Sequence, residues 1–157
     1  MLFLWLKYLH VVGAAVLLGT GAGIAFFMMM AHRTGNAAII AAVARIVVIA
    51  DCLFTASAIV VQPLTGVALV LYLGYSFSDH WIVLSLILYV VTGLFWLPVV
   101  GMQMEMRRLA AEAAAAGAAL PARYVTLYRR WFAFGFPAFF AVLAILWLMI
   151  QRPALIW

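Results

Sequence analysis

Four long apolar segments constrain this chain more than any other feature of its sequence. They comprise residues 3–30, 46–73, 81–104 and 131–150. About 20 consecutive apolar residues are enough for a helix to cross the hydrocarbon core of a bilayer. Because backbone polar groups find no water there, a spanning segment satisfies them internally, as a helix. The sequence therefore predicts an all-α fold, a four-helix transmembrane bundle that occupies residues 1–157 as a single domain.

The composition excludes a soluble globular protein. Hydrophobic residues make up 71% of the chain and charged residues 8%, whereas a soluble domain is roughly half apolar and a quarter charged. The formal net charge is +5, but the basic residues flank the apolar segments and form no stripe. We therefore expect membrane lipids with anionic headgroups as partners, and no nucleic acid. The sequence carries no GxSxG, HExxH or phosphate-binding glycine loop, so a hydrolase is not expected.

The basic residues are distributed unequally between the two sides of the predicted bundle. The first and third connections carry or adjoin seven arginines: Arg33, Arg45, Arg107, Arg108, Arg123, Arg129 and Arg130. Lys7 and Arg152 flank the other side. By the positive-inside rule, the two arginine-bearing connections are cytoplasmic and both termini lie on the outer side.

Turn-forming residues mark the connections. Thr34, Gly35 and Asn36 predict a short elbow after the first helix. The third helix is expected to continue through the alanine-rich residues 109–116, with Gly117 ending it and Pro121 in the first turn of the next helix. The single cysteine, Cys52, excludes an internal disulfide and a multi-cysteine metal site, and we expect it to be a small packing residue.

His10 is the main candidate functional residue, because an ionisable group inside an apolar segment is a functional candidate by default. Gly13, Ala14 and Gly21 lie within a quarter-turn of it and are predicted to leave a groove for a flat ligand beside the imidazole. His32 and His80 fall at membrane edges, where an imidazole is usually just solvated. A second small-residue series on the opposite face is suited to close helix contact or to a homo-oligomer; its members are Ala15, Gly19 and Gly23.

Two polar stripes are predicted to face the bundle interior, because polar groups in hydrocarbon need partners. The second helix carries Asp51, Thr55, Ala58, Gln62, Thr65 and Leu69 at helical spacing, and the third carries Ser85, Tyr89, Thr92 and Trp96. Pro63 is expected to free a backbone carbonyl one turn earlier. Counting about 1.5 Å per residue places His10, Gln62, Ser85 and Tyr89 at a similar depth.

The stripes admit more than one role. The groups near His10 are either interhelical hydrogen bonds that hold the bundle together or the lining of a ligand pocket. Asp51 lies nearer the cytoplasmic side and is expected to form an ion pair with Arg45 or Arg130, with proton handling as the alternative.

The WLKYLH opening and the Gln62-Pro63-Leu64-Thr65-Gly66 segment carry a family likeness. Together with Gly19-Thr20-Gly21, Ala50-Asp51 and Trp96-Leu97-Pro98, they resemble a bacterial family of predicted integral membrane proteins known as a domain of unknown function. This resemblance implies a multi-pass protein of the bacterial cytoplasmic (inner) membrane.

A more distant resemblance connects the chain to the HemJ-type protoporphyrinogen oxidases and the copper-resistance D membrane domain. In HemJ-like proteins the helix-1 histidine that corresponds to His10 is regarded as a haem ligand. This chain departs from them at Ser85, where they carry a lysine, and residues 90–96 lack their helix-3 histidine. The resemblance therefore implies haem binding more than porphyrinogen oxidation, with a methionine, another histidine or water as the second axial ligand.

Two functions follow as hypotheses. The first is a membrane-embedded b-type haem protein, with His10 as axial ligand to the metal, Gly13, Ala14 and Gly21 admitting the macrocycle, and Gln62, Ser85 and Tyr89 around it. It implies a redox or electron-transfer role and a redox partner, and it leaves open whether the protein is an enzyme. The alternative is a cofactor-free membrane bundle that binds a lipid-like small molecule or supports a partner complex.

Overall fold

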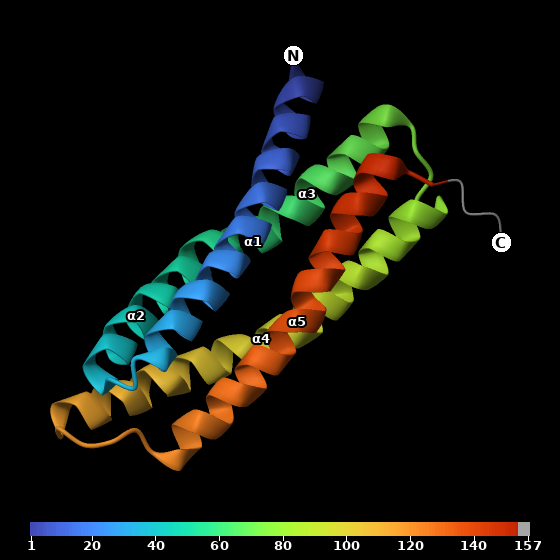
Figure 1. Cartoon of the computed structure of the whole chain (residues 1–157). Helices are drawn as coiled ribbons and strands as arrows, with labels where there is room; N and C mark the ends of the chain where they lie inside the picture. The colour runs from blue at the N-terminus through green and yellow to red at the C-terminus, as the bar shows by residue number, and fades with distance from the viewer. Residues whose placement is uncertain (154–157) are drawn as a thin grey trace.

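The computed structural model describes residues 1–153, and nearly all of them are helical (Figure 1). The helices are α1 (Leu2–Arg33), α2 (Ala37–Ala50), a π-helical segment η1 (Asp51–Thr55), α3 (Ala56–Leu73), α4 (His80–Ala115) and α5 (Ala122–Gln151). Because α2, η1 and α3 form one continuous helix, the described residues form four helices long and apolar enough to cross a membrane. This confirms the predicted all-α, four-helix architecture.

The helices are longer than the apolar segments predicted from the sequence. The second span begins at Ala37, nine residues before the predicted start, and α4 continues to Ala115, eleven residues beyond Met104. The alanine-rich stretches at both places favour helix whether or not lipid surrounds them. The predicted continuation of the third helix through the alanine-rich residues 109–116 is thus confirmed to Ala115, whereas the second helix begins earlier than its apolar segment indicated.

The predicted turn residues end and begin the helices as expected. The Asn36 side chain accepts hydrogen bonds from the backbone N–H groups of Ala38 and Ile39, at 2.9 and 3.2 Å, and so caps α2. Gly35 and Gly117 take the left-handed conformation, with φ of 64° and 59°, which glycine adopts without strain. Pro121, predicted in the first turn of the last helix, instead lies one residue earlier, immediately before α5.

The four spans alternate in direction, so the N-terminus and the end of α5 lie toward one end of the bundle (Figure 1). We call this end, with the connection between α3 and α4, the terminal end. We call the other the arginine-rich end, because it holds the connections from α1 to α2 and from α4 to α5. Each of the seven arginines named above lies near that end.

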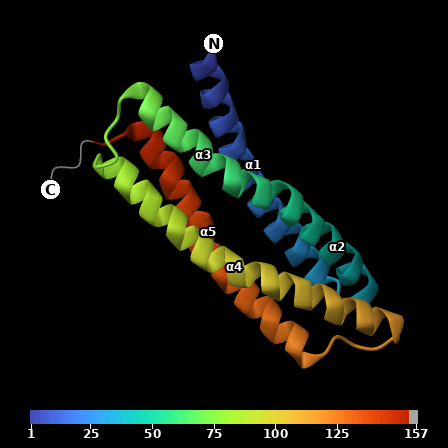
Figure 2. The same cartoon turned by 180° about the vertical axis from the view of Figure 1, so that it is seen from behind.

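The helices pack in different pairs at the two ends (Figures 1 and 2). Toward the arginine-rich end α2 packs against α4 and α1, and α4 runs along α5. The largest fully buried side chains cluster there: Tyr124, Met28, Ile40 and Met106. Toward the terminal end α3 packs against α1. The His10 group lies in this α1–α3 contact, outside the main core.

Candidate functional site

The His10 imidazole bridges α1 to α3. Its Nδ1 lies 2.9 Å from the Thr65 hydroxyl. That hydroxyl is within 2.7 Å of the Val61 carbonyl, to which it donates its single hydrogen. It therefore accepts from His10, and the imidazole carries its proton on Nδ1. The geometry leaves the lone pair of Nε2 available.

The Nε2 nitrogen of His10 makes no hydrogen bond within the described residues. The imidazole is half-buried in the α1–α3 contact, and the Gln62 backbone carbonyl also lies close to it. His10 stands three residues beyond Lys7 and two beyond Tyr8, which is exposed, as is Trp5. Aromatic and basic residues of this kind anchor at the membrane–water boundary. Nε2 is thus an unused acceptor about one helical turn below that boundary.

Gln62 forms the second link between the same two helices. Its Nε2 donates to the backbone carbonyl of His10 at 2.7 Å. The amide lies directly over Gly13, where an added Cβ would stand 2.6 Å from the Gln62 nitrogen. The groove predicted beside His10 is therefore filled at Gly13 by the Gln62 side chain, and that part of the interpretation is corrected. The prediction that His10 and Gln62 lie at one depth is confirmed.

The other residues of the Gln62 to Gly66 motif also have structural roles. Gly66 lets α3 approach the imidazole, because an added Cβ would lie 3.2 Å from His10 Cε1. Pro63 has no N–H, so it leaves the Ile59 carbonyl without its helical donor. The Tyr89 hydroxyl of α4 donates to that carbonyl. The freed carbonyl predicted from Pro63 is thus confirmed, and it ties α4 to α3.

The remaining predicted site residues lie apart from the imidazole. Ser85 is buried but donates to the carbonyl of Trp81 in its own helix. Ala14 is partly buried, and nothing lies within 4 Å of a Cβ added at Gly21. The structure therefore brings Gln62 and Thr65 to His10 and connects Tyr89 to them through Ile59 and the α3 backbone. The involvement of Ser85, Ala14 and Gly21 in binding stays a prediction.

A second polar group surrounds Asp51, which is 4% exposed. The Trp96 indole N–H donates to one carboxyl oxygen at 3.3 Å. With its amide oriented to satisfy both neighbours, Gln103 donates to the other carboxyl oxygen at 3.0 Å and accepts from the Trp131 indole at 3.1 Å. The two indoles and the amide thus form a chain of hydrogen bonds that joins α4 and α5 to η1.

The ion pair predicted for Asp51 is wrong. Arg45 and Arg130 are exposed, and the ion pairs among residues 1–153 join Arg108 to Glu105 and Glu112, and Arg123 to Glu105. Both arginines stand on helix faces turned to the surroundings, where a guanidinium stays hydrated at little cost. The expectation that Cys52 packs inside is also wrong, because its side chain is exposed beside Asp51.

Sequence reasoning missed two residues of these groups. Thr65 belonged to the predicted stripe but was not recognised as the partner of His10, because helix rotation decides that contact. Gln103 is polar and lies two residues before Glu105, at the end of an apolar segment. A polar residue in that position is easily interpreted as interfacial, although its side chain is 4% exposed.

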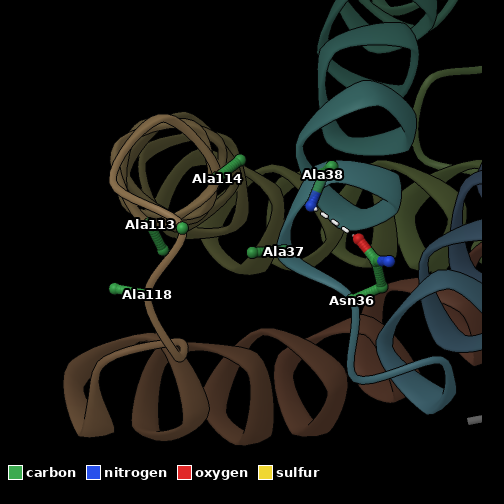
Figure 3. A pocket seen from close by; sticks show the side chains of 7 residues that line it. Asn36, Ala37, Ala38, Ala113, Ala114 and Ala118 are labelled. Carbon is green, nitrogen blue, oxygen red and sulfur yellow. Dashed lines mark hydrogen bonds between the residues drawn. The ribbon is translucent and has the colours of Figure 1, made fainter.

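Two hollows of the described surface lie apart from His10. One of about 340 Å³ is lined by Val48, Ile49, Cys52 and Leu53. Another, of about 280 Å³, lies between the start of α2 and the end of α4 (Figure 3). In that second hollow Asn36 already caps the free N–H groups of α2. Neither hollow supplies a pocket next to His10.

Four spanning helices, apolar outer faces and polar groups turned inward define an integral membrane protein. A family model described as a predicted integral membrane protein, DUF2269, matches residues 4–153. The chain belongs to this family, which confirms the closer of the two resemblances. No curated protein and no solved structure matches the chain.

Proposed function

We propose that this protein is a b-type haem protein of the bacterial cytoplasmic membrane in which His10 Nε2 is an axial ligand. The observation that carries the proposal is the state of the half-buried imidazole: Nδ1 is held by Thr65, and Nε2 has no hydrogen bond of good geometry within the described chain. Histidines that ligate metals characteristically donate the other ring N–H to an oxygen, which fixes the tautomer and the ring orientation.

The surroundings limit where a macrocycle fits. The space over Gly13 is taken by Gln62, and Gly66 lies against the Cε1 edge of the ring. Gln62 and Gly66 would therefore limit how a haem approaches His10. The redox or electron-transfer role belongs to this proposal, since haem supplies one-electron chemistry when bound. His10 would position the iron, and Thr65 would tune the imidazole.

The orientation is part of the same proposal. The arginine-rich end would face the cytoplasm under the positive-inside rule, and His10 would lie in the outer leaflet. Labelling of single cysteines placed at position 76 and at position 118, in a Cys52→Ser background, tests it in intact cells. Position 76 should react with an impermeant reagent and position 118 should not. The reverse pattern would refute the assignment of sides.

The haem proposal is tested by absorption spectroscopy of the purified full chain, expressed with haem supply. We expect a Soret band that His10→Ala removes and that His80→Ala, a histidine change at the same end, leaves in place. Thr65→Val should keep the band but raise the reduction potential, because the imidazole loses its hydrogen-bond acceptor and becomes a weaker electron donor. A haem-supplied wild-type protein without a Soret band would refute the proposal.

A second function is favoured by the same Nε2 nitrogen, which has no hydrogen bond of good geometry within the described chain. An imidazole nitrogen near the membrane boundary accepts a hydrogen bond from the hydroxyl headgroup of a lipid-like molecule without any pocket. Native mass spectrometry of the purified chain distinguishes this case. A bound lipid that is lost in His10→Ala, together with no Soret band in the wild type, would support it over haem.

A further inference from the structure

Asp51 is a carboxyl group inside the bundle whose hydrogen-bonding neighbours are neutral. Its donors are the Trp96 indole and the Gln103 amide. An ionised carboxylate without a counter-charge is expensive to place in hydrocarbon, and such a group neutralises itself where it can. Asp51 stands six residues beyond Arg45, about 9 Å further into the membrane at 1.5 Å per residue.

No compensating charge faces Asp51 from the helices packed around it. The sequence of α1 contains no titratable residue from position 11 to 31, and that of α4 contains none between Tyr89 and Glu105. The same is true of α5 from position 131 to 150. On its own helix the nearest such residues are Arg45 and Cys52, and both side chains are exposed.

The Thr55 hydroxyl lies beside the Asp51 carboxyl group and differs from the other helical hydroxyls. Most other helical hydroxyls of the described chain bond to the carbonyl four residues earlier: Ser57, Thr65, Ser85, Thr92 and Thr126. The Thr55 hydroxyl is buried next to the Asp51 carboxyl, is 6% exposed, and makes no hydrogen bond of good geometry. In η1 the backbone is wound with five-residue hydrogen bonds. This winding leaves the Thr55 hydroxyl available to the carboxyl group.

A species that neutralises the Asp51 carboxylate carries one positive charge. Within the described residues no group of three or more His, Cys, Asp or Glu side chains could hold a metal ion. A metal cation needs several oxygen ligands and a cavity of its own size. A proton needs neither, because it binds to one carboxyl oxygen and then donates to a neighbouring acceptor.

We propose that Asp51 is a proton-binding site of the membrane-embedded bundle, with the carboxyl O–H donating to Thr55 Oγ1. Binding converts the carboxylate and one proton from water at the arginine-rich side into a neutral carboxyl group. Trp96 and Gln103 hold the two carboxyl oxygens in place. This site is separate from His10 and does not depend on haem binding.

Carbon-13 NMR of the carboxyl groups tests the proposal directly. The chain has two aspartates, Asp51 and Asp79. Full-length protein synthesised cell-free with carboxyl-labelled aspartate, in lipid nanodiscs, therefore gives two signals. We expect Asp51 at the chemical shift of a protonated carboxyl group at neutral pH and Asp79 at that of a carboxylate. Asp79→Asn leaves the Asp51 signal alone, so the assignment does not require any change at Asp51.

Two further measurements separate the remaining outcomes. Thr55→Val should move the Asp51 signal, because the carboxyl O–H loses its acceptor, while Ser57→Ala on the exposed face should not. Replacing sodium by N-methylglucamine at constant pH should leave the signal unchanged. An Asp51 signal at the carboxylate position at neutral pH, or one that follows sodium, would overturn the proposal.

Discussion

Gly13 should tolerate a methyl group less well than any other glycine of α1. An alanine Cβ at this position would stand 2.6 Å from the Gln62 nitrogen, so the Gln62 amide must move. The movement breaks its hydrogen bond to the His10 carbonyl. An interhelical bond in a membrane bundle contributes about 0.6 kcal/mol on average, and overpacking a contact costs about 1–3 kcal/mol.

The higher helix propensity of alanine partly offsets this loss of stability. Gly→Ala within a helix is favourable by up to about 1 kcal/mol. We therefore expect Gly13→Ala to destabilise the protein by about 1–2 kcal/mol, after the gain in helix propensity is subtracted from overpacking and the lost bond. Gly21→Ala meets nothing within 4 Å, so it should be neutral or slightly stabilising.

A double-mutant cycle isolates the contact. In a Gln62→Ala background the methyl group meets no amide, so Gly13→Ala should stabilise the protein, and the coupling between the two sites should reach about 2 kcal/mol. The stability of the wild type, the two single variants and the double variant is measured by unfolding the full chain with increasing sodium dodecyl sulfate in mixed micelles. Far-ultraviolet circular dichroism follows the unfolding. Equal effects of Gly13→Ala with and without Gln62 would refute the reasoning.

Two further predictions concern α4. Tyr89→Phe removes the donor to the Ile59 carbonyl and should lower the free energy of unfolding by about 0.6–2 kcal/mol in the same assay. The loss should be smaller in a Pro63→Ala background, because residue 63 then has an N–H that bonds to that carbonyl. An equal loss in both backgrounds would argue against the link. Beyond the apolar segment that ends at Met104, ion pairs with arginines, of which Arg108 contributes most, lower the pKa of Glu105 to about 2. The stability that these ion pairs give to the folded protein is therefore present above pH 4.5 and is lost as the pH falls toward about 2. In the same unfolding assay the wild type should become less stable as the pH is lowered over this range, and Glu105→Gln should lose less stability.

Counting along the helices was enough to predict the depth of the His10 group. His10 and Gln62 meet because helix rise is constant, and the Ile59 carbonyl is free because proline has no N–H. These inferences depend on properties of single helices. They needed no knowledge of how the helices turn relative to each other.

The sequence did not reveal which side chains touch. The Thr65 contact with His10 depends on the rotation of α3, and the burial of Gln103 depends on α4 and α5 together. The π-helical segment was hidden as well, because the spacing of four between Asp51 and Thr55 is also that of an α-helix. A spacing pattern identifies a polar face but does not identify its partners.

The winding of η1 also has a consequence for how sequences of this family vary. A residue added to a helix turns everything after it by about 100°, and η1 accommodates such an extra residue within an unbroken span. α2 can therefore face α4 while α3 faces α1. A homologue that lacks one residue between positions 51 and 55 would cross the membrane equally well. Its Gln62 and Thr65 would point away from α1, so a one-residue gap in an alignment here would mark a protein without the His10 contacts.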